Sequence, residues 1–566
     1  MHEPKKTPQF YLQSLGPHSF TAAIVAIISI KLLADSALNS SLAFVFLYKQ
    51  DVWLILTGML VLGACAVTAR RHTDLPAWKP PALWLGGGAM AVLVWLGHRV
   101  VLLGYDMSRD EQLANFDARI FASGHLVAPL HAPWSEYADA LNTTFMLSVS
   151  DRSAWVSGYL PGNAAIRALF ETAGAASLVG PLAVLIGGLA LWGCARKIWP
   201  QDRSAASLAA LLYFTSGQVL LNGMSSYAMP LHLAANLVWL WLFLQNRLRQ
   251  DLLALCIAFV AVGLHQPLFH PMFAFPLLLG VVLERNWLRS GVFLAGYLLI
   301  GAFWFWWPLY SASLTGSPLP GGNAGYLTRL SLALSQGEEG GLLKMIANLV
   351  RFVAWQNLAL IPLLVIGVRH LVHDRLMAAL AASLALTIIV MTVILPYQGH
   401  GFGYRYLHGL IGNAILLAVS GWRIVRAHFP RWNSLVVRAS LFGTLVLLPM
   451  QLTFAQSFYA PYAAASRAID ALGTDYVLIQ GQGAPFAQDL VINDPYLAHR
   501  PIRLLQEYTT PSLLRAICRD GASVGQLPAA YYGRIQEYYT RSSDVSGHLD
   551  KRKLTSTRLA KVCKLQ

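Results

Sequence analysis

The chain has 566 residues, of which 56% are hydrophobic and only 12% charged, and its formal net charge is +15 at pH 7. A soluble fold of this size needs more charged surface, so the composition indicates a polytopic membrane protein. The basic residues stand in short clusters between apolar runs, as they do in loops on the cytoplasmic side of a membrane. This pattern excludes nucleic acid as the partner that the positive charge would otherwise suggest.

Apolar runs long enough to cross the hydrocarbon layer of a membrane recur along most of the chain. They predict an α-helical transmembrane domain over residues 20–455, with about thirteen membrane-spanning helices. The expected spans are residues 20–36, 52–69, 82–104, 177–194, 204–222, 229–245, 251–264, 268–284, 290–308, 357–370, 376–396, 408–424 and 437–455.

The charge of the connections predicts the orientation of these helices. The N-terminal tail, residues 1–19, contains "KK", and no small-residue cleavage site follows the first apolar run, so we expect a cytoplasmic tail rather than a signal peptide. With that start, every connection on the cytoplasmic side is basic, "ARKIWPQDR" and "GWRIVRAHFPRWNSLVVR" among them. Two large loops, residues 105–176 and 309–355, are then expected on the outer side.

The polar C-terminal region, residues 456–566, is expected on the outer side as a small α/β domain. "DYVLIQG" is typical of a strand, and "APFAQDLVIN" and "PSLLRAICRDG" are typical of helices. In an oxidising outer compartment Cys518 and Cys563 are a candidate disulfide, with two unpaired cysteines as the alternative.

The first outer loop opens with the acidic stretch "YDMSRDEQLANFDARIFASG". Asp110 and Glu111 are the candidate catalytic residues in it, because a carboxylate beside a basic partner can take a proton from an acceptor hydroxyl. The same pair could ligate a divalent cation, Mg²⁺ or Mn²⁺. A solvated loop or a helix N-terminus, where acidic residues are favoured, is the structural alternative.

Polar residues near other outer membrane boundaries are candidate contacts of a phosphate or a sugar. Tyr159 begins the turn "YLPG", for which an ordinary loop-to-helix junction is the alternative. His265 and His270 flank "QPLF", where a helix-breaking proline argues against a metal pair, and interfacial histidines with satisfied hydrogen bonds are the alternative. His232 lies about one turn inside its predicted span, a depth at which polar groups are costly and often functional.

The segment "GHGFGYRYLHG" is the second concentrated signal. Its glycines permit tight turns, and His400, Arg405 and His408 supply hydrogen-bond donors beside Tyr404. Arginine suits a phosphate because its planar guanidinium offers two parallel charge-assisted hydrogen bonds. Anchoring of the chain at the membrane interface by tyrosine and arginine is the alternative.

Three segments resemble the GT-C superfamily of polyprenyl-phosphate-sugar-dependent membrane glycosyltransferases, especially its protein O-mannosyltransferase-like and aminoarabinose-transferase-like branch. They are "SRDEQLANFDARIFASGHLVAPL", "WVSGYLPGNAAIRALFETAGAASLVGPLAVLIGGLALWGCARKIW" and "GFGYRYLHGLIGNAILLAVSGW", and the resemblance covers roughly Met107 to Trp422. The chain departs from that branch in two respects. Two extra spans precede the acidic pair, and "GLHQPLFHP" stands where a basic residue is expected.

The resemblance implies a GT-C-like fold in the bacterial inner membrane, with a periplasmic C-terminal domain. It implies transfer of a sugar from a polyprenyl-phosphate donor to an envelope lipid, glycan or protein, with inversion at the anomeric carbon. Asp110 would match the catalytic carboxylate and act as general base. Arg405 would match a basic residue near the lipid phosphate. The candidates drawn from the residues themselves, His400, His408, Tyr404, His265, His270, His232 and Tyr159, are the further expected contacts of the donor phosphate or sugar.

Two other classes of function stay open at this point. A lipid or polysaccharide transporter or flippase would move its substrate without forming a glycosidic bond, but few charges lie inside the spans and no inverted repeat is visible. A non-catalytic assembly scaffold is the third reading. The absence of a Walker motif, a GxGxxG loop and an HExxH helix argues against a nucleotide-driven pump and a zinc protease.

Overall fold

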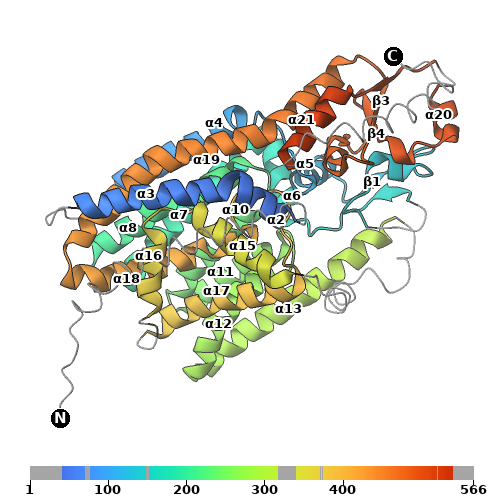
Figure 1. The fold of residues 1–566 in the computed structure, drawn as a ribbon. Helices are drawn as coiled ribbons and strands as arrows, with labels where there is room; N and C mark the ends of the chain where they lie inside the picture. The colour runs from blue at the N-terminus through green and yellow to red at the C-terminus, as the bar shows by residue number, and fades with distance from the viewer. Residues whose placement is uncertain are drawn as a thin grey trace, which may run out of the picture.

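The computed structural model describes residues 41–69, 75, 77–147, 152–315, 340–369, 371, 374–518 and 521–539. Over these residues the chain is mainly helical, with a few short strands. The helices form a long bundle, and the C-terminal residues lie at one end of it, beside α5 (Arg109–Ala122) and β1 (Ala128–Pro129) (Figure 1). The predicted cytoplasmic tail and the predicted span at residues 20–36 lie outside the described residues.

Seven described helices are long and apolar enough to cross a membrane. The first runs from Leu42 to Thr68 and contains α2 (Leu42–Phe46), the π-helical turn η1 (Leu47–Asp51) and α3 (Val52–Thr68). The others are α4 (Pro80–Val100), η3 with α7 (Ala176–Leu178, Val179–Ile198), α13 (Trp287–Ser313), α17 (Arg375–Ile394), η5 with α18 (Arg405–Leu410, Ile411–His428) and α19 (Arg431–Ala471). The prediction of an α-helical polytopic membrane protein is therefore confirmed.

The predicted count of about thirteen spans is not confirmed. One predicted span is the pair α8 (Arg203–Phe214) and α9 (Gly217–Met224), which bend by 51° at their junction and make an eighth crossing if they are one span. Four others are helices of fewer than eighteen residues, because loops or turns end them early. These four are α10 (Met229–Phe243), α11 (Leu248–Gly263), α12 (Phe269–Leu283) and α16 (Leu360–Val368).

A helix that the sequence analysis did not predict lies in the expected outer loop at residues 309–355. It is α15 (Gly341–Ala354), which buries Asn348 and Arg351 together with apolar side chains on one face. Lysine, asparagine and arginine interrupt its apolar pattern, so it does not read as a membrane span. In the same region α13 continues to Ser313, five residues past the predicted end of its span at residue 308.

Basic connections that were predicted on one side of the membrane meet in space. Asp202, in the connection between α7 and α8, lies 2.9 Å from the Nε of Arg423 and also pairs with Arg426, both near the end of α18. Asp251 and Arg289 pair at 2.8 Å between the starts of α11 and α13. The first of these clusters, where the α7–α8 connection meets the end of α18, lies at the end of the bundle away from the C-terminal residues (Figure 1). Which side of the membrane it faces stays a prediction.

The C-terminal region is built on a small parallel sheet in the order β4–β3–β5. Its strands are β3 (Tyr476–Ile479), β4 (Ile502–Leu505) and β5 (Val524–Gln526). Its helices are η6 (Pro485–Leu490), η7 (Gln506–Tyr508), α20 (Pro511–Cys518) and α21 (Ala529–Tyr539). The predicted strand and the predicted helix at "PSLLRAICRDG" are confirmed, whereas "APFAQDLVIN" forms a 3₁₀ turn.

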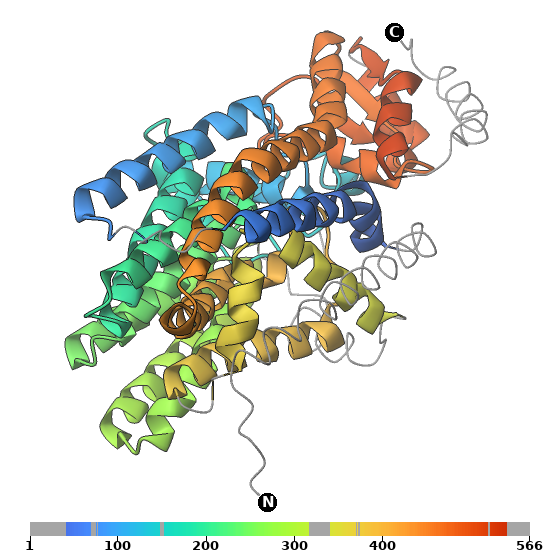
Figure 2. The ribbon, with the colours of Figure 1, turned by 60° about the vertical axis from the view of Figure 1, so that its left-hand side comes forward.

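The helix α19 joins this region to the membrane bundle. It runs unbroken for 41 residues, past the predicted end of its span at residue 455, and α3 packs along it (Figures 1 and 2). The predicted domain boundary at residue 456 therefore falls inside a helix, and the separate domain stays a prediction. Cys518 is in a disulfide, while Cys65, Cys194 and Cys256 are free. Cys563, the predicted disulfide partner of Cys518, lies outside the described residues.

The first outer loop and the C-terminal region share one hydrophobic core. Phe116 and Ile120 of α5 pack in it with Trp155 of β2 (Ala154–Trp155) and with Leu478 and Leu504 of the parallel sheet. Because apolar burial is the main stabilising contribution in a fold, this core anchors α5 to the parallel sheet. The loop is completed by η2 (Ala138–Leu141) and α6 (Gly162–Glu171).

Candidate active site

Asp110 is presented by the first turn of α5. Ser108 is the N-cap residue of this helix, and its side chain accepts a hydrogen bond from the backbone N–H of Glu111. The Glu111 carboxylate in turn accepts from the backbone N–H of Ser108 at 3.1 Å, which completes a capping box. "SRDE" is therefore a helix start, and the helix dipole favours the negative charge of Asp110 at this position.

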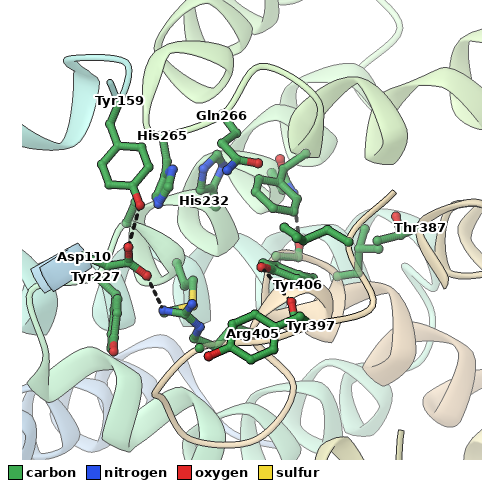
Figure 3. Close-up of a pocket in the computed structure, with 18 of the residues that line it drawn as sticks. Asp110, Tyr159, Tyr227, His232, His265, Gln266, Thr387, Tyr397, Arg405 and Tyr406 are labelled. Atoms are coloured by element: carbon green, nitrogen blue, oxygen red, sulfur yellow. Dashed lines mark hydrogen bonds and ion pairs between the residues drawn. The ribbon is translucent and has the colours of Figure 1, made fainter. Parts of the chain in front are cut away.

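Asp110 is held by two partners that come from distant parts of the chain. The Tyr159 hydroxyl donates to Oδ1 at 2.6 Å, and Nη1 of Arg405 donates to Oδ2 at 2.9 Å (Figure 3). Burial raises the pKa of Asp110, but the charge of Arg405 and these two hydrogen bonds outweigh it and hold the pKa below its ordinary value. Asp110 is therefore ionised at neutral pH.

The turn "YLPG" places Tyr159 by docking on the end of α11. The backbone N–H of Leu160 donates to the carbonyl of His265 at 3.1 Å, and the Tyr159 ring lies 4.1 Å from the His265 ring between centroids. A Cβ on Gly162 would lie 2.6 Å from the Gly263 carbonyl oxygen, so the close approach needs glycine here. Tyr159 and His265 therefore reach the site as one unit.

The glycine-rich segment before η5 wraps around Arg405. Gln398, at the start of this segment, closes it into a loop, since its Oε1 accepts from the Arg405 N–H at 2.9 Å and its Nε2 donates to the Gly403 carbonyl at 2.8 Å. Gly401 has φ +146, and a Cβ there would overlap the Arg405 side chain. The buried Arg351 donates to the Gly401 carbonyl at 2.8 Å. These contacts fix the guanidinium, whose centre lies 4.8 Å from the Tyr227 ring centroid.

Asp110 and Arg405 line a cavity of about 220 Å³, which we call the Asp110 cavity. Charged and polar side chains line it together with apolar ones such as Phe145, Phe269 and Leu395. A concave, mainly apolar site with a few convergent polar groups is the usual form of a small-molecule site. The labelled lining residues in Figure 3 are Asp110, Tyr159, Tyr227, His232, His265, Gln266, Thr387, Tyr397, Arg405 and Tyr406.

Five of the residues singled out in the sequence line this cavity: Asp110, Tyr159, His232, His265 and Arg405. They come from α5, the loop before α6, α10, the α11–α12 connection and η5, so only the tertiary fold brings them together. Within the described part of the chain, both ring nitrogens of His232 and Nδ1 of His265 are buried without a hydrogen-bond partner. Burial also lowers the pKa of His265, which favours the neutral imidazole.

The other predicted site residues have different surroundings. Glu111 is fully buried, and Ser108 and Tyr459 hold its carboxylate, with the Tyr459 hydroxyl 3.0 Å from each oxygen. His270 bonds to Asn236 and to the Tyr297 hydroxyl, both at 2.8 Å. Neither residue is among those that line the Asp110 cavity.

His400, Tyr404 and His408 lie close to Arg405 in sequence but are packed into the protein beside the cavity. His400 Nε2 lies 2.9 Å from the hydroxyl of Tyr539 on α21, and burial lowers the pKa of His400 to about 3, so its contact with Asp489 is not an ion pair at neutral pH. Tyr404 and His408 are buried, and both ring nitrogens of His408 have no hydrogen-bond partner among the described residues. Their predicted contact with the donor stays a prediction.

Sequence reasoning missed Tyr227, which supports the centre of the site. Its ring packs against the Arg405 guanidinium, and its hydroxyl joins Ser108 at 2.6 Å to the His400 carbonyl at 2.9 Å. Tyr227 thereby links the capping residue of α5 to the glycine-rich segment. The only signal in the sequence is a tyrosine in the polar connection "GMSSYAMP", which is too common to identify it.

The donor groups present do not fit a divalent cation at Asp110 and Glu111. Both oxygens of Asp110 are taken by Tyr159 and Arg405, and the Glu111 carboxylate is taken by Ser108 and Tyr459. Across the residues that the structure describes, no three His, Cys, Asp or Glu side chains gather as a ligand set. A guanidinium beside the carboxylate would also repel a metal ion.

The fold and the site together define a polytopic α-helical membrane protein with a carboxylate–arginine pair at a cavity between its helices. Solved structures with this fold include ArnT from Cupriavidus metallidurans bound to undecaprenyl phosphate, which aligns over 74% of this chain and 86% of that chain at 13% identity and a TM-score of 0.50. The apo state of the same protein aligns over 73% of this chain and 84% of that chain at 14% identity and a TM-score of 0.47.

At this level of identity the likeness establishes the fold. The resemblance to the aminoarabinose-transferase-like branch of the GT-C superfamily, drawn from three sequence segments, is thereby confirmed as a resemblance of fold. No family model matches the sequence, and no curated protein matches it either.

Proposed function

We propose that this chain is an integral-membrane glycosyltransferase that moves a sugar from a polyprenyl-phosphate donor to an acceptor of the cell envelope. The observation that carries the proposal is the pairing of Asp110 with Arg405 and Tyr159 at the Asp110 cavity. A carboxylate is a base and an arginine is a phosphate ligand, and the reaction needs both at one point. The neighbour of the same fold binds undecaprenyl phosphate, which supports a polyprenyl-linked donor here.

The donor phosphate would bind at Arg405. The guanidinium uses Nη1 for Asp110, and its Nε has no hydrogen-bond partner among the described residues, so it retains capacity for an anion. The apolar walls of the cavity, with Phe269 and Leu395, suit the lipid next to the phosphate. His232 and His265 bring ring nitrogens to the same cavity, where sugar hydroxyls would satisfy them.

Binding of the donor phosphate would activate Asp110. In the described state Arg405 and Tyr159 hold the pKa of Asp110 down, which makes it a weak base. A phosphate that takes over the guanidinium removes this countercharge, and the burial of Asp110 then raises its pKa. The base would therefore be strongest only when the donor is in place.

The transfer itself would be a single displacement. Asp110 takes the proton of an acceptor hydroxyl, the acceptor oxygen forms a bond to the anomeric carbon, and the bond from that carbon to the phosphate oxygen breaks. The lipid phosphate leaves with the bonding electrons, and Arg405 stabilises the negative charge that grows on it. Attack opposite to the leaving group inverts the anomeric carbon. Transfer would take place on the periplasmic side of the bacterial inner membrane.

The test is a product assay with purified protein, a polyprenyl-phosphate sugar and an envelope lipid extract. We expect Asp110→Asn to lower the rate of glycosidic bond formation by about 100-fold or more, because general base catalysis contributes about 10²–10⁴-fold. Asp139→Asn is the matched control, since Asp139 pairs with Arg152 in the same loop and does not line the cavity. A transfer rate of Asp110→Asn equal to that of the control would overturn the assignment.

One observation keeps the transporter alternative in view. The helix pair α8–α9 bends by 51° between Phe214 and Gly217, and broken helices line the substrate sites of many secondary transporters. The break is filled by side chains of the protein, because Asn357 donates to Thr215 at 2.6 Å and Ser216 donates to Gln356 at 2.9 Å. The product assay separates the two classes, since a transporter forms no glycosidic bond.

A further inference from the structure

A second cavity lies beside α5, apart from the residues that line the Asp110 cavity. It has a volume of about 200 Å³ and is enclosed by α5, α6, the start of α7 and the end of α9. We call it the Arg167 cavity. The residues that matter for its chemistry are His98, Asp106, Arg119, Arg167, Glu171 and Ser177.

Arg167 is a buried cation that forms no direct ion pair with a described carboxylate. Its side chain is 4% exposed and is held by Asn163 at 3.2 Å from Nε and by the Ser225 carbonyl at 3.5 Å from Nη2. Within the described residues no carboxylate lies within ion-pair distance of it, although the charges of Asp106 and Glu111 act on it from farther away, and its Nη1 has no hydrogen-bond partner. A buried guanidinium left in this state is costly, and an anion in the cavity would relieve the cost through a charge-assisted hydrogen bond.

The N-terminus of a long helix reaches the same cavity. Ser177 of η3 and Gly180 of α7 line it, and α7 continues for 20 residues with no acidic residue in its first turn. The positive end of the helix dipole therefore faces the cavity. The carboxylates that line the cavity are Asp106, which accepts from Asn115 at 2.5 Å, and the exposed Glu171 at the end of α6.

The surroundings of the cavity indicate the source of the anion. His98 near the end of α4 and Ser177 before α7 line it, and both α4 and α7 are candidate membrane spans that pack together. Their neighbouring side chains Leu96, Val100 and Leu178 are exposed and apolar. A lipid whose acyl chains lay along these surfaces would bring its headgroup to the cavity.

We propose that the Arg167 cavity binds the phosphate of an anionic membrane lipid, whose acyl chains lie along α4 and α7. Arg167 would hold the phosphate through its free Nη1, and the start of α7 would add the field of its dipole. This site does not depend on the proposed reaction, because it involves neither Asp110 nor Arg405.

The proposal is tested by lipid binding to the full-length protein in detergent. The probe is fluorescent phosphatidylglycerol, followed by anisotropy, with phosphatidylcholine and inorganic phosphate as competitors. We expect Arg167→Gln to weaken binding by about tenfold or more, because a charge-assisted hydrogen bond is lost. Ser177→Glu, an exposed position where acidic residues favour the helix, places a carboxylate at the cavity and is expected to weaken binding by a similar factor without harming the fold.

Lys197→Gln is the matched control, because it removes a charge from an exposed position at the other end of α7. It is expected to bind the probe as the parent does. Parent-like binding by Arg167→Gln and Ser177→Glu would overturn the proposal. Displacement of the probe by inorganic phosphate at the concentrations at which phosphatidylglycerol binds would overturn the lipid assignment. Displacement by phosphatidylcholine at those same concentrations would overturn the role of the negative charge.

Discussion

Replacement of Tyr159 by phenylalanine tests the electrostatic account of Asp110. The ring of Tyr159 packs against His265 and Phe145, with centroid distances of 4.1 and 5.3 Å, and phenylalanine keeps both contacts. The variant loses only the hydroxyl that donates to Asp110 Oδ1 at 2.6 Å. The change therefore isolates one hydrogen bond to the proposed base.

The size and the sign of the effect follow from that hydrogen bond. It stabilises the charged form of Asp110 and is one of the contributions that lower its pKa. A hydrogen bond to a charged group is worth about 1.5–3 kcal/mol, and about 1.4 kcal/mol corresponds to one pKa unit. Loss of the hydroxyl should therefore raise the pKa of Asp110 by about 1–2 units. The base works only when it is ionised. As the pH is lowered, the variant should therefore lose activity at a higher pH than the parent protein does.

The assay is the pH profile of kcat/KM for sugar transfer, which reports the pKa of the free enzyme. We expect the acid limb of the profile to move to higher pH by about 1–2 units in Tyr159→Phe. Tyr508→Phe, an exposed tyrosine of the C-terminal region, is the control and should keep the parent profile. An acid limb at the parent position, or one moved to lower pH, would refute the reasoning.

Three further predictions concern the segment that carries Arg405. Arg405→Lys keeps the charge but loses the planar fork, so we expect KM for the donor to rise by about tenfold or more in steady-state kinetics, and an unchanged KM would exclude a role in donor binding. Gly401→Ala should lower activity by at least about tenfold because its Cβ overlaps Arg405, whereas Gly86→Ala, with open space around it, should retain activity. Tyr539→Phe removes the hydroxyl next to His400 Nε2, and we expect a lower kcat and a thermal midpoint lower by a few degrees; parent values in both would show that α21 does not support the segment.

The long apolar helices could be predicted from the sequence because length and hydropathy alone define a membrane span. The short helices could not be assigned in this way. For example, α10 buries most of its residues against neighbouring helices and need not cross the membrane to do so. The helix α15 was missed because it contains charged and polar residues whose partners lie far away in the sequence. Its Arg351 pairs with Asp51 at 3.2 Å in the folded chain, and no local pattern reveals a partner 300 residues away.

The active-site carboxylate was found from the sequence, but its neighbour shows the limit of that reasoning. Asp110 and Glu111 are equivalent as a pair of acids, and only the helix start separates them, because the third residue after Ser108 closes the capping box and the second is free to face the cavity. The signature "SRDE" contains this information. Tyr227 and Gln398, in contrast, act through contacts with distant segments, so their roles appear only in the fold.

The orientation of the first outer loop tests the central claim most directly, since the proposed donor is presented outside the cytoplasm. The measurement is labelling of Glu136→Cys, an exposed position in that loop, by a membrane-impermeant thiol reagent, with Lys197→Cys as the comparison at the other end of α7. We predict that Glu136→Cys is labelled in intact spheroplasts and that Lys197→Cys is labelled only after lysis. The reverse pattern would place the Asp110 cavity on the cytoplasmic side and contradict the account.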